Sequence, residues 1–282
     1  MRGCSVFVQV ASAGSRLRPH LKSSQPVRNP YCPWPHWARA LTDLPFRYVL
    51  LMAQPGRKLA SGRDADIFEF GPGLVLRRSR KGRSVAHEAR VMEYLHGSGY
   101  PVPAIHGVSD DGTELVMERI DGPTMVDYLS RRPWQIRHLG RTLAGLHRQL
   151  HEIPPPDFLG PAAFGQGESL VHMDLHPLNV LIGPHGPVVI DWTNAGRGDP
   201  LVDVTLAYLL IASGTIPGGR FEQKVLGWGR TQLIRGFLGG RDRSALRPRI
   251  LEVAERKTAD PNLSTEEIQA MWKIAREVAQ EH

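Results

Sequence analysis

The chain contains few cysteines and no long apolar segment. Its 282 residues include two cysteines, Cys4 and Cys32, and both precede the part of the chain that carries chemical motifs. The apolar run 202–212 is broken by Asp203 and Thr205, so it falls short of the roughly 18 apolar residues of a membrane span. We therefore expect no disulfide in the functional body, no membrane partner, and a soluble protein in a reducing, cytoplasmic compartment.

Acidic residues are nearly absent from residues 1–51. This segment holds seven Lys and Arg residues against Asp43 alone, so it carries +6 of the formal net charge of +7. Because the remainder is nearly neutral, the overall charge is no evidence for a specific nucleic-acid partner. The segment is rich in Pro, Arg and Ser and shows no apolar period, which favours a disordered leader or a misassigned start, with Met52 as the working start. An organellar transit peptide stays open, and a secretory signal fits less well because the apolar core is short and polar.

The segment 171–192 is the most informative part of the chain. Asp174 is followed five residues later by Asn179, and Asp191 ends the apolar run 188–190. A carboxylate can accept a proton from a hydroxyl group, and amide and carboxylate oxygens are hard ligands for a Mg²⁺ that bridges nucleotide phosphates. The pattern therefore predicts a phosphoryl-transfer site.

These motifs resemble the aminoglycoside phosphotransferase and choline kinase-like family, distant relatives of protein kinases. The resemblance covers roughly residues 56–240 and rests on His172-x-Asp174-x-His176-x-x-Asn179, Ile190-Asp191-Trp192 and Gly198-Asp199-Pro200-x-x-Asp203. It implies an ATP-dependent phosphotransferase that uses Mg²⁺ and phosphorylates a hydroxyl of a small molecule. In that family Asp174 would be the catalytic base, Asn179 and Asp191 the metal ligands, His172 and His176 braces of the catalytic loop, and Asp203 its anchor.

The resemblance also implies an α+β, bilobal protein-kinase-like fold. A small antiparallel β-sheet lobe that binds the nucleotide would span residues 52–120, and a mainly helical catalytic and substrate lobe residues 121–282. Local patterns agree: residues 65–70 and 73–78 read as two strands joined by a turn, and residues 84–97 as an amphipathic helix.

Nucleotide contacts follow from the same resemblance. Arg77 would meet the phosphates, with Glu88 on the following helix holding it in place. A strand slip by one residue would aim Arg78 inward instead. Gly62 would let the backbone approach the phosphates, although a plain turn glycine explains it equally well. Backbone groups of Glu118 and Ile120, beside Met117, would read the adenine.

Three later patterns describe the large lobe. Apolar residues recur every three or four positions in 136–150, Asp199-Pro200 reads as the start of the apolar helix 201–212, and Ser264-x-x-Glu267 is a capping box that opens a last helix. The stretch 220–249 contains eight basic and two acidic residues. It would repel a polycationic aminoglycoside if it lined the acceptor pocket, or it is a solvated basic face.

Two other functions fit parts of the same sequence. His172, Asp174 and His176 alternate, so on a strand they would present metal ligands on one face, as in a metal-dependent hydrolase. That hypothesis leaves Asn179 and Asp191 unexplained. A catalytically silent ATP-binding module is the non-enzymatic alternative, and the intact set of Asp174, Asn179 and Asp191 argues against it. The identity of the acceptor and the oligomeric state do not follow from the sequence.

Overall fold

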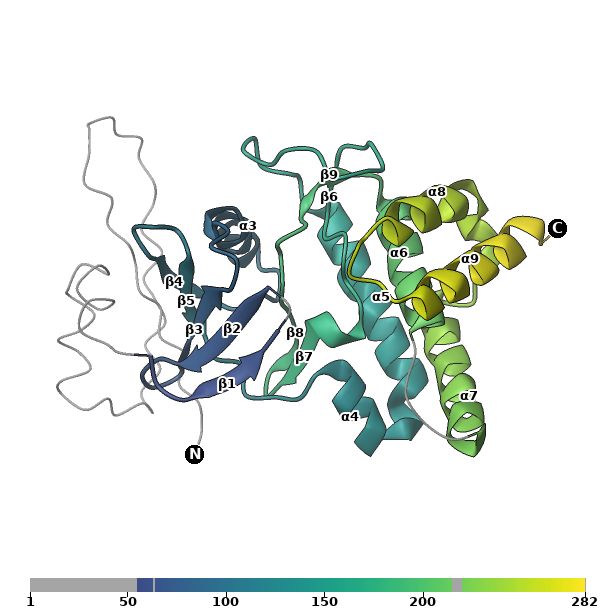
Figure 1. Ribbon diagram of the computed structural model, residues 1–282, viewed down its shortest axis with the longest axis horizontal. Coiled ribbons are helices and arrows are strands. Elements are labelled where there is room, and N and C mark those ends of the chain that lie inside the picture. The colour runs from purple at the N-terminus through teal and green to yellow at the C-terminus, as the bar shows by residue number, and fades with distance from the viewer. Residues whose placement is uncertain (1–54, 63, 215–219, 282) are drawn as a thin grey trace. The chain divides into compact units, whose positions relative to one another are not determined.

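The computed structural model describes residues 55–62, 64–214 and 220–281. The leader 1–51, both cysteines and Met52 lie outside these residues, as do the side chains of residues 220–226 in the basic stretch. No helix among the described residues is long and apolar enough to span a membrane. The described chain divides into two compact units, residues 55–86 with 104–119, and residues 87–103 with 120–281 (Figure 1).

The first unit is built around a five-stranded antiparallel sheet in the order β1-β2-β3-β5-β4. Strands β2 and β3 form the predicted hairpin, with Ala65 opposite Ser79 and Glu69 opposite Val75. Gly71 and Gly73 between them have positive φ angles, which glycine adopts without steric cost. One face carries the core residues Phe70, Leu76 and Val116. The strands are β1 (Lys58–Ser61), β2 (Ala65–Glu69), β3 (Leu74–Ser79), β4 (Ile105–Val108) and β5 (Glu114–Glu118).

The second unit is mainly helical and contains two short antiparallel strand pairs, β6 with β9 and β7 with β8. Helix α3, predicted from residues 84–97, belongs to this unit by its contacts. The helices are α3 (Ala86–Gly97), α4 (Met125–Arg131), α5 (Ile136–Glu152), α6 (Pro200–Ser213), α7 (Arg220–Phe237), α8 (Arg247–Thr258) and α9 (Thr265–Gln280). The strands are β6 (Ser169–Val171), β7 (Val180–Gly183), β8 (Gly186–Val189) and β9 (Gly196–Gly198), and short 3₁₀ turns lie at Pro133–Gln135, Pro177–Asn179 and Arg243–Leu246.

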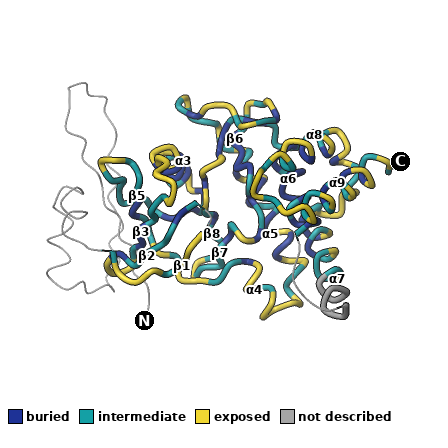
Figure 2. Tube along the Cα trace, in the orientation of Figure 1, coloured by how far each residue is buried: buried dark blue, intermediate teal, exposed yellow. Residues whose placement is uncertain are grey.

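The core of the second unit follows the apolar periods of its sequence. Leu139, Leu143, Leu146 and Leu150 of α5 are buried, and α6 is buried along most of its length (Figure 2). Helix α6 begins as predicted, because the Asp199 carboxylate accepts the Leu201 N–H at 2.8 Å and Pro200 occupies the first turn. The predicted capping box of α9 is present at Ser264 and Glu267.

Helices α5 and α7 approach closely through two glycines. A Cβ atom at Gly140 would overlap the Leu233 carbonyl oxygen, and one at Gly236 would overlap the Arg137 carbonyl oxygen. The small residues thus let the two backbones pack together, which holds α5 against a second helix.

The apolar side of α9 is narrower than the sequence pattern suggests. Met271, Ala275 and Val278 are buried, whereas Ile268 and Trp272 line a shallow hollow on the outer face of the helix. The guanidinium of Arg276 covers the Trp272 ring at 5.7 Å. The last helix therefore packs through the single stripe formed by Met271, Ala275 and Val278.

Candidate active site

A loop with a strained backbone follows the end of β6. Met173 has a φ angle of 62° and Asp191 one of 65°, a region that non-glycine residues seldom occupy without a compensating interaction. The compensation at Met173 comes from Asp203 in the first turn of α6. One carboxylate oxygen of Asp203 accepts the Met173 N–H at 2.8 Å, and the other accepts the His172 N–H at 3.3 Å. Asp203 therefore fixes the turn that presents Asp174.

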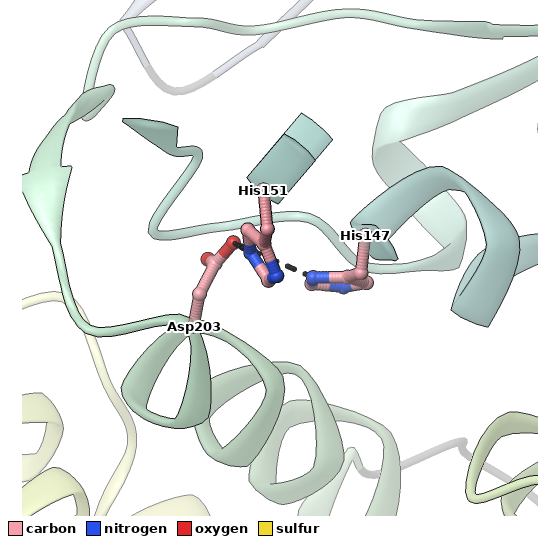
Figure 3. Close-up of side chains that lie close together, drawn as sticks. All are labelled: His147, His151 and Asp203. Atoms are coloured by element: carbon pink, nitrogen blue, oxygen red, sulfur yellow. Dashed lines mark hydrogen bonds and ion pairs between the residues drawn. The ribbon is translucent and has the colours of Figure 1, made fainter. Parts of the chain in front are cut away.

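Asp203 is itself held by two histidines of α5 (Figure 3). His151 Nε2 lies 3.0 Å and His147 Nδ1 lies 3.4 Å from Asp203 Oδ2. The opposite nitrogen of His147, Nε2, lies 3.1 Å from the Leu175 carbonyl oxygen, so His147 contacts both the anchor and the loop. Burial acts to raise the pKa of Asp203, but the close contacts of these two histidines hold that pKa well below its usual value. The carboxylate is thus kept ionised inside the protein.

Asp174 lies in this loop with its two oxygens facing different groups. Its Oδ2 accepts the Asn179 amide at 3.2 Å and is 3.6 Å from His176 Nε2. Its Oδ1 is 3.9 Å from the ammonium of Lys257, in the last turn of α8. Burial acts to raise the pKa of Asp174, but His176 and Lys257 keep it below its usual value. At neutral pH the group is therefore a carboxylate that can accept a proton.

Asn179 and Asp191 are brought to the same end of the β7–β8 hairpin. Val180 pairs with Val189, and the next bond runs from the Ile190 N–H to the Asn179 carbonyl oxygen at 3.0 Å. The Asn179 side-chain nitrogen donates to the Asp174 carbonyl oxygen at 2.9 Å, so the amide oxygen is the atom of this side chain that can bind a cation. Amide and carboxylate oxygens are the donor set that Mg²⁺ prefers, and the two residues fit such an ion.

The two histidines predicted to brace the loop make different contacts. His172 is fully buried, and its Nε2 lies 3.2 Å from the Ile190 carbonyl oxygen, which connects the loop to the segment that carries Asp191. Burial lowers the pKa of His172. His176 accepts the Leu178 N–H through Nδ1 at 3.3 Å, so a neutral His176 carries its proton on Nε2, toward Asp174.

The alternation expected for a metal-dependent hydrolase is absent from the fold. Strand β6 ends at Val171 and the chain turns at Met173, so His172, Asp174 and His176 do not share one face of a strand. Within the described residues, the His, Cys, Asp and Glu side chains that cluster closely enough to hold a metal are His147, His151 and Asp203. The predicted hydrolase triad is not among them.

The register of β3 separates Arg77 from Arg78. Arg78 pairs with Glu114 at 2.6 Å and stacks on Phe68 at 5.1 Å. Successive side chains of a strand point to opposite faces, so Arg77 lies on the other face of the sheet. Glu88 of α3 is buried, with an exposed fraction of 4%. The phosphate role of Arg77 and the supporting role of Glu88 stay predictions.

The remaining predicted nucleotide residues lie at turns and strand ends. The Gly62 N–H donates to the Ala65 carbonyl oxygen at 2.8 Å, a bond typical of the turn glycine that the sequence also allowed. Met117 and Glu118 end β5, and the Glu118 N–H donates to the Ala104 carbonyl oxygen at 2.8 Å. Because this N–H is already bonded, the backbone group of Glu118 that could contact adenine is its carbonyl oxygen. Ile120 follows this strand, and its adenine contact also stays a prediction.

Comparison with known proteins identifies the family. The model of the phosphotransferase enzyme family matches residues 55–168 and 159–248. The chain belongs to this family. The match confirms the resemblance that the motifs of this phosphotransferase indicated. The metal-dependent hydrolase and the silent ATP-binding module are not favoured. None of the curated proteins matches its sequence.

Solved structures show the same fold at low sequence identity. A choline/ethanolamine kinase family protein from Mesorhizobium loti is 16% identical, with a TM-score of 0.51 over 87% of this chain and 94% of that protein. A thermostable variant of aminoglycoside phosphotransferase APH(4)-Ia with ADP and hygromycin B is 14% identical, with a TM-score of 0.56 over 80% and 94%. The apo form of a thermostable mutant of APH(4)-Ia gives 16% identity and a TM-score of 0.57 over 83% of this chain and 98% of that protein. The predicted α+β kinase-like fold of this phosphotransferase is confirmed.

Three residues of the site escaped the sequence interpretation. His147 lies next to Leu146, and His151 lies next to Leu150, within the apolar pattern of α5. Polar residues on a buried stripe of a helix are unusual, and this was the signal in the sequence that could have indicated their role. Lys257 was missed because the charge of α8 was counted only to residue 249. It continues the spacing of the buried residues Ile250, Val253 and Ala254.

We expect Asp203→Asn to lower the free energy of unfolding by about 2–4 kcal/mol, because a buried, charge-assisted hydrogen-bond network loses its anion. Urea unfolding measures this loss. A carboxyl with a lowered folded-state pKa stabilises above its unfolded pKa of about 3.9 and loses that effect as pH falls through the folded value. The difference from wild type should therefore stay constant from neutral pH to about pH 5 and shrink in stronger acid.

The exposed Asp110 supplies a control, and Asp110→Asn should change the free energy of unfolding by less than about 0.5 kcal/mol. Equal stability of Asp203→Asn and Asp110→Asn would refute the anchoring role of Asp203.

Proposed function

We propose that this phosphotransferase transfers the γ-phosphoryl group of ATP to a hydroxyl of a small molecule. The observation that carries the proposal is the arrangement of Asp174, Asn179 and Asp191 on one anchored loop and the adjoining hairpin. Phosphoryl transfer needs positioned groups and neutralised charge more than covalent chemistry from the protein. The bound ADP and hygromycin B of the APH(4)-Ia complex are the corresponding ligands of a protein with the same fold.

Asp174 would receive the proton of the attacking hydroxyl. It is ionised at neutral pH for the reasons given above, and its Oδ2 is already bonded to Asn179 at 3.2 Å. Oδ1 is therefore the oxygen available to the acceptor. Moving the loop would cost free energy, because Asp203 accepts hydrogen bonds from the N–H groups of the two residues that precede Asp174.

Asn179 and Asp191 would hold Mg²⁺ through their side-chain oxygens. Asn179 would be oriented for this by the two bonds of its Nδ2 atom to Asp174. When bound, the ion would neutralise charge on the nucleotide phosphates. Arg77 would add a fixed positive charge to the same phosphates, with Glu88 as its support.

We propose different functions for the two lobes. We assign nucleotide binding to residues 52–120, including Gly62, Met117, Glu118 and Ile120, and catalysis and acceptor binding to residues 121–282. A reaction that consumes ATP and a chain whose motif region lacks cysteine both favour a cytoplasmic location.

Mass spectrometry of reactions with Mg-ATP tests the proposal. The purified protein is incubated with a set of hydroxylated metabolites and aminoglycosides, and each reaction is searched for a phosphorylated product and for ADP. We expect at least one product that requires ATP and Mg²⁺. Binding of Mg-ATP without any product or ADP would favour the silent module, and turnover that depends on zinc would favour the hydrolase.

A further inference from the structure

Lys257 occupies a core-facing position of α8. The buried residues Ile250, Val253 and Ala254 define the inner stripe of this helix, and Lys257 follows them at the spacing of the next buried residue. Its side chain has an exposed fraction of 18%. An apolar residue would continue this stripe without the desolvation cost of an ammonium group. The charge at this position therefore calls for a partner or a function.

The ammonium group is oriented by a neighbouring turn. Its Nζ lies 3.4 Å from Asp260 Oδ2. Asp260 Oδ1 accepts both the backbone N–H of Asn262 at 3.0 Å and its side-chain amide at 2.7 Å. These bonds fix the carboxylate of Asp260 and aim its second oxygen at Lys257. The ammonium is thus held in place by the segment between α8 and α9.

The second neighbour of Lys257 is Asp174. The distance from Nζ to Asp174 Oδ1 is 3.9 Å, too long for a hydrogen bond. An ammonium has three donors, so the bond to Asp260 leaves donors that a ligand can use. Asn179 and His176 contact the other carboxylate oxygen of Asp174, Oδ2. Lys257 therefore lies at Oδ1 of Asp174, and the proposed metal ligand Asn179 lies at Oδ2.

A hydroxyl that gives its proton to Asp174 must come within about 3 Å of a carboxylate oxygen. Because Oδ1 faces Lys257, the atoms next to that hydroxyl would lie a few ångströms from a positive charge. The carboxylates of Asp260 and Asp174 lie against the same ammonium, so a preference for a carboxylate or phosphate would come from a direct bond to the remaining donors of Lys257. An ammonium group on the acceptor could not form that bond, because it has no acceptor atom to offer Lys257.

Three basic residues of the stretch 220–249 make bonds at other places in the second unit. Arg249 pairs with Asp199 at 2.8 Å and with Glu252 at 3.3 Å. Arg230 donates to the Ala212 carbonyl oxygen at 3.0 Å, and Arg243 pairs with Glu281. These three residues of the basic stretch 220–249 hold the fold together. Lys257, eight residues beyond that stretch, places its ammonium beside Asp174 instead.

We propose that Lys257 is the acceptor-recognising residue of this site, and that the acceptor is a small hydroxylated molecule with an anionic group, a carboxylate or a phosphate ester, close to the reacting hydroxyl. This inference rests on the proposed kinase function. A purely structural Lys257 would pair with Asp260 and Asp174 without any effect on the choice of acceptor.

Four compounds with one carbon skeleton test the preference: glycerol, D-glycerate, glycerol 3-phosphate and 3-amino-1,2-propanediol. Each is measured both as an acceptor for Mg-ATP and, by calorimetry, as a ligand of the protein with Mg-ATP bound. The variants are Lys257→Met, which keeps an apolar stem of similar length, and Arg256→Met, which removes an exposed charge from the same helix. Melting temperatures and Mg-ATP binding are recorded for all three proteins.

We expect the wild type and Arg256→Met to respond to one or both anions at concentrations at least about 10-fold lower than to glycerol or to the amine. Lys257→Met should lose this preference, through KM or Kd of the acceptor, while its ATP binding and melting temperature stay near wild type. A response to glycerate alone assigns a carboxylate site, and a response to glycerol 3-phosphate alone a phosphate site.

Equal or stronger response of the wild type to the amine overturns the inference, as does an anion preference that survives in Lys257→Met or the absence of any anion preference in the wild type. The proposed function fails separately. A wild-type protein that neither binds Mg-ATP nor turns it over contradicts the kinase assignment itself, whereas ATP-dependent phosphorylation of an aminoglycoside upholds that assignment and refutes the role of Lys257.

Discussion

Asp174→Asn is expected to lower turnover by roughly 10²–10⁴-fold, the range for loss of a group that transfers a proton in the transition state. Asn is nearly isosteric with Asp and can still bond to the Asn179 amide through its oxygen. Binding of Mg-ATP should therefore remain near the wild-type value. Single-turnover kinetics with a productive acceptor, together with nucleotide binding by calorimetry, separate the two effects.

Asp127→Asn provides the control, because this exposed carboxylate caps the first turn of α4 with Thr124 and has no place in the proposed chemistry. Its turnover should match the wild type. If Asp174→Asn were as active as Asp127→Asn, another group would have to take the proton.

The second large effect concerns Asp191. Asp191→Ala removes one of two proposed ligands of Mg²⁺, so we expect Mg-dependent nucleotide binding to weaken by at least about 10-fold and turnover to fall by about 10³-fold or more. Isothermal titration of ATP with and without Mg²⁺ gives the metal-dependent part of binding directly.

Glu255→Ala removes an exposed carboxylate from α8 and should leave both quantities unchanged. Added zinc should not restore Asp191→Ala or activate the wild type. Strong activation by zinc with Mg²⁺ dispensable would contradict the proposed metal site.

The parts of the fold that the sequence predicted are those with strong local signals. The β2–β3 hairpin has alternating side chains and glycines at its turn, α6 has its Asp199 cap followed by Pro200, and α9 has its capping box. In each case the residues that determine the element lie within it or next to it. Turns and helix caps of this kind can be predicted from the sequence alone, because they do not depend on contacts between distant segments.

The residues that escaped prediction depend on contacts between distant segments. His147 and Asp203 are 56 positions apart, and Lys257 is 83 positions from Asp174, so no motif spacing connects them. Their meaning appears only when α5, α6 and α8 are packed around the loop. The hydrolase hypothesis failed for a related reason. It assumed a straight strand through 172–176, and the chain turns at Met173 because Asp203 binds the N–H groups there.

The Asp203 cluster explains why a strained loop can serve as a site. A positive φ angle at Met173 costs stability, and the hydrogen bonds from two backbone N–H groups to a buried carboxylate offset that cost. His147 and His151 in turn keep Asp203 ionised. The position of Asp174 is therefore maintained by groups that need not touch any substrate.

The most direct test of the account is the stoichiometry of phosphoryl transfer. Phosphorylated acceptor, ADP and inorganic phosphate are quantified together by mass spectrometry and ³¹P NMR in one reaction with Mg-ATP. The account predicts equal amounts of ADP and phosphorylated acceptor in the wild type, and a rate lower by roughly 10²–10⁴-fold with Asp174→Asn. Formation of ADP and inorganic phosphate without any phosphorylated acceptor, or the same rate of product formation in the wild type and Asp174→Asn, would contradict it.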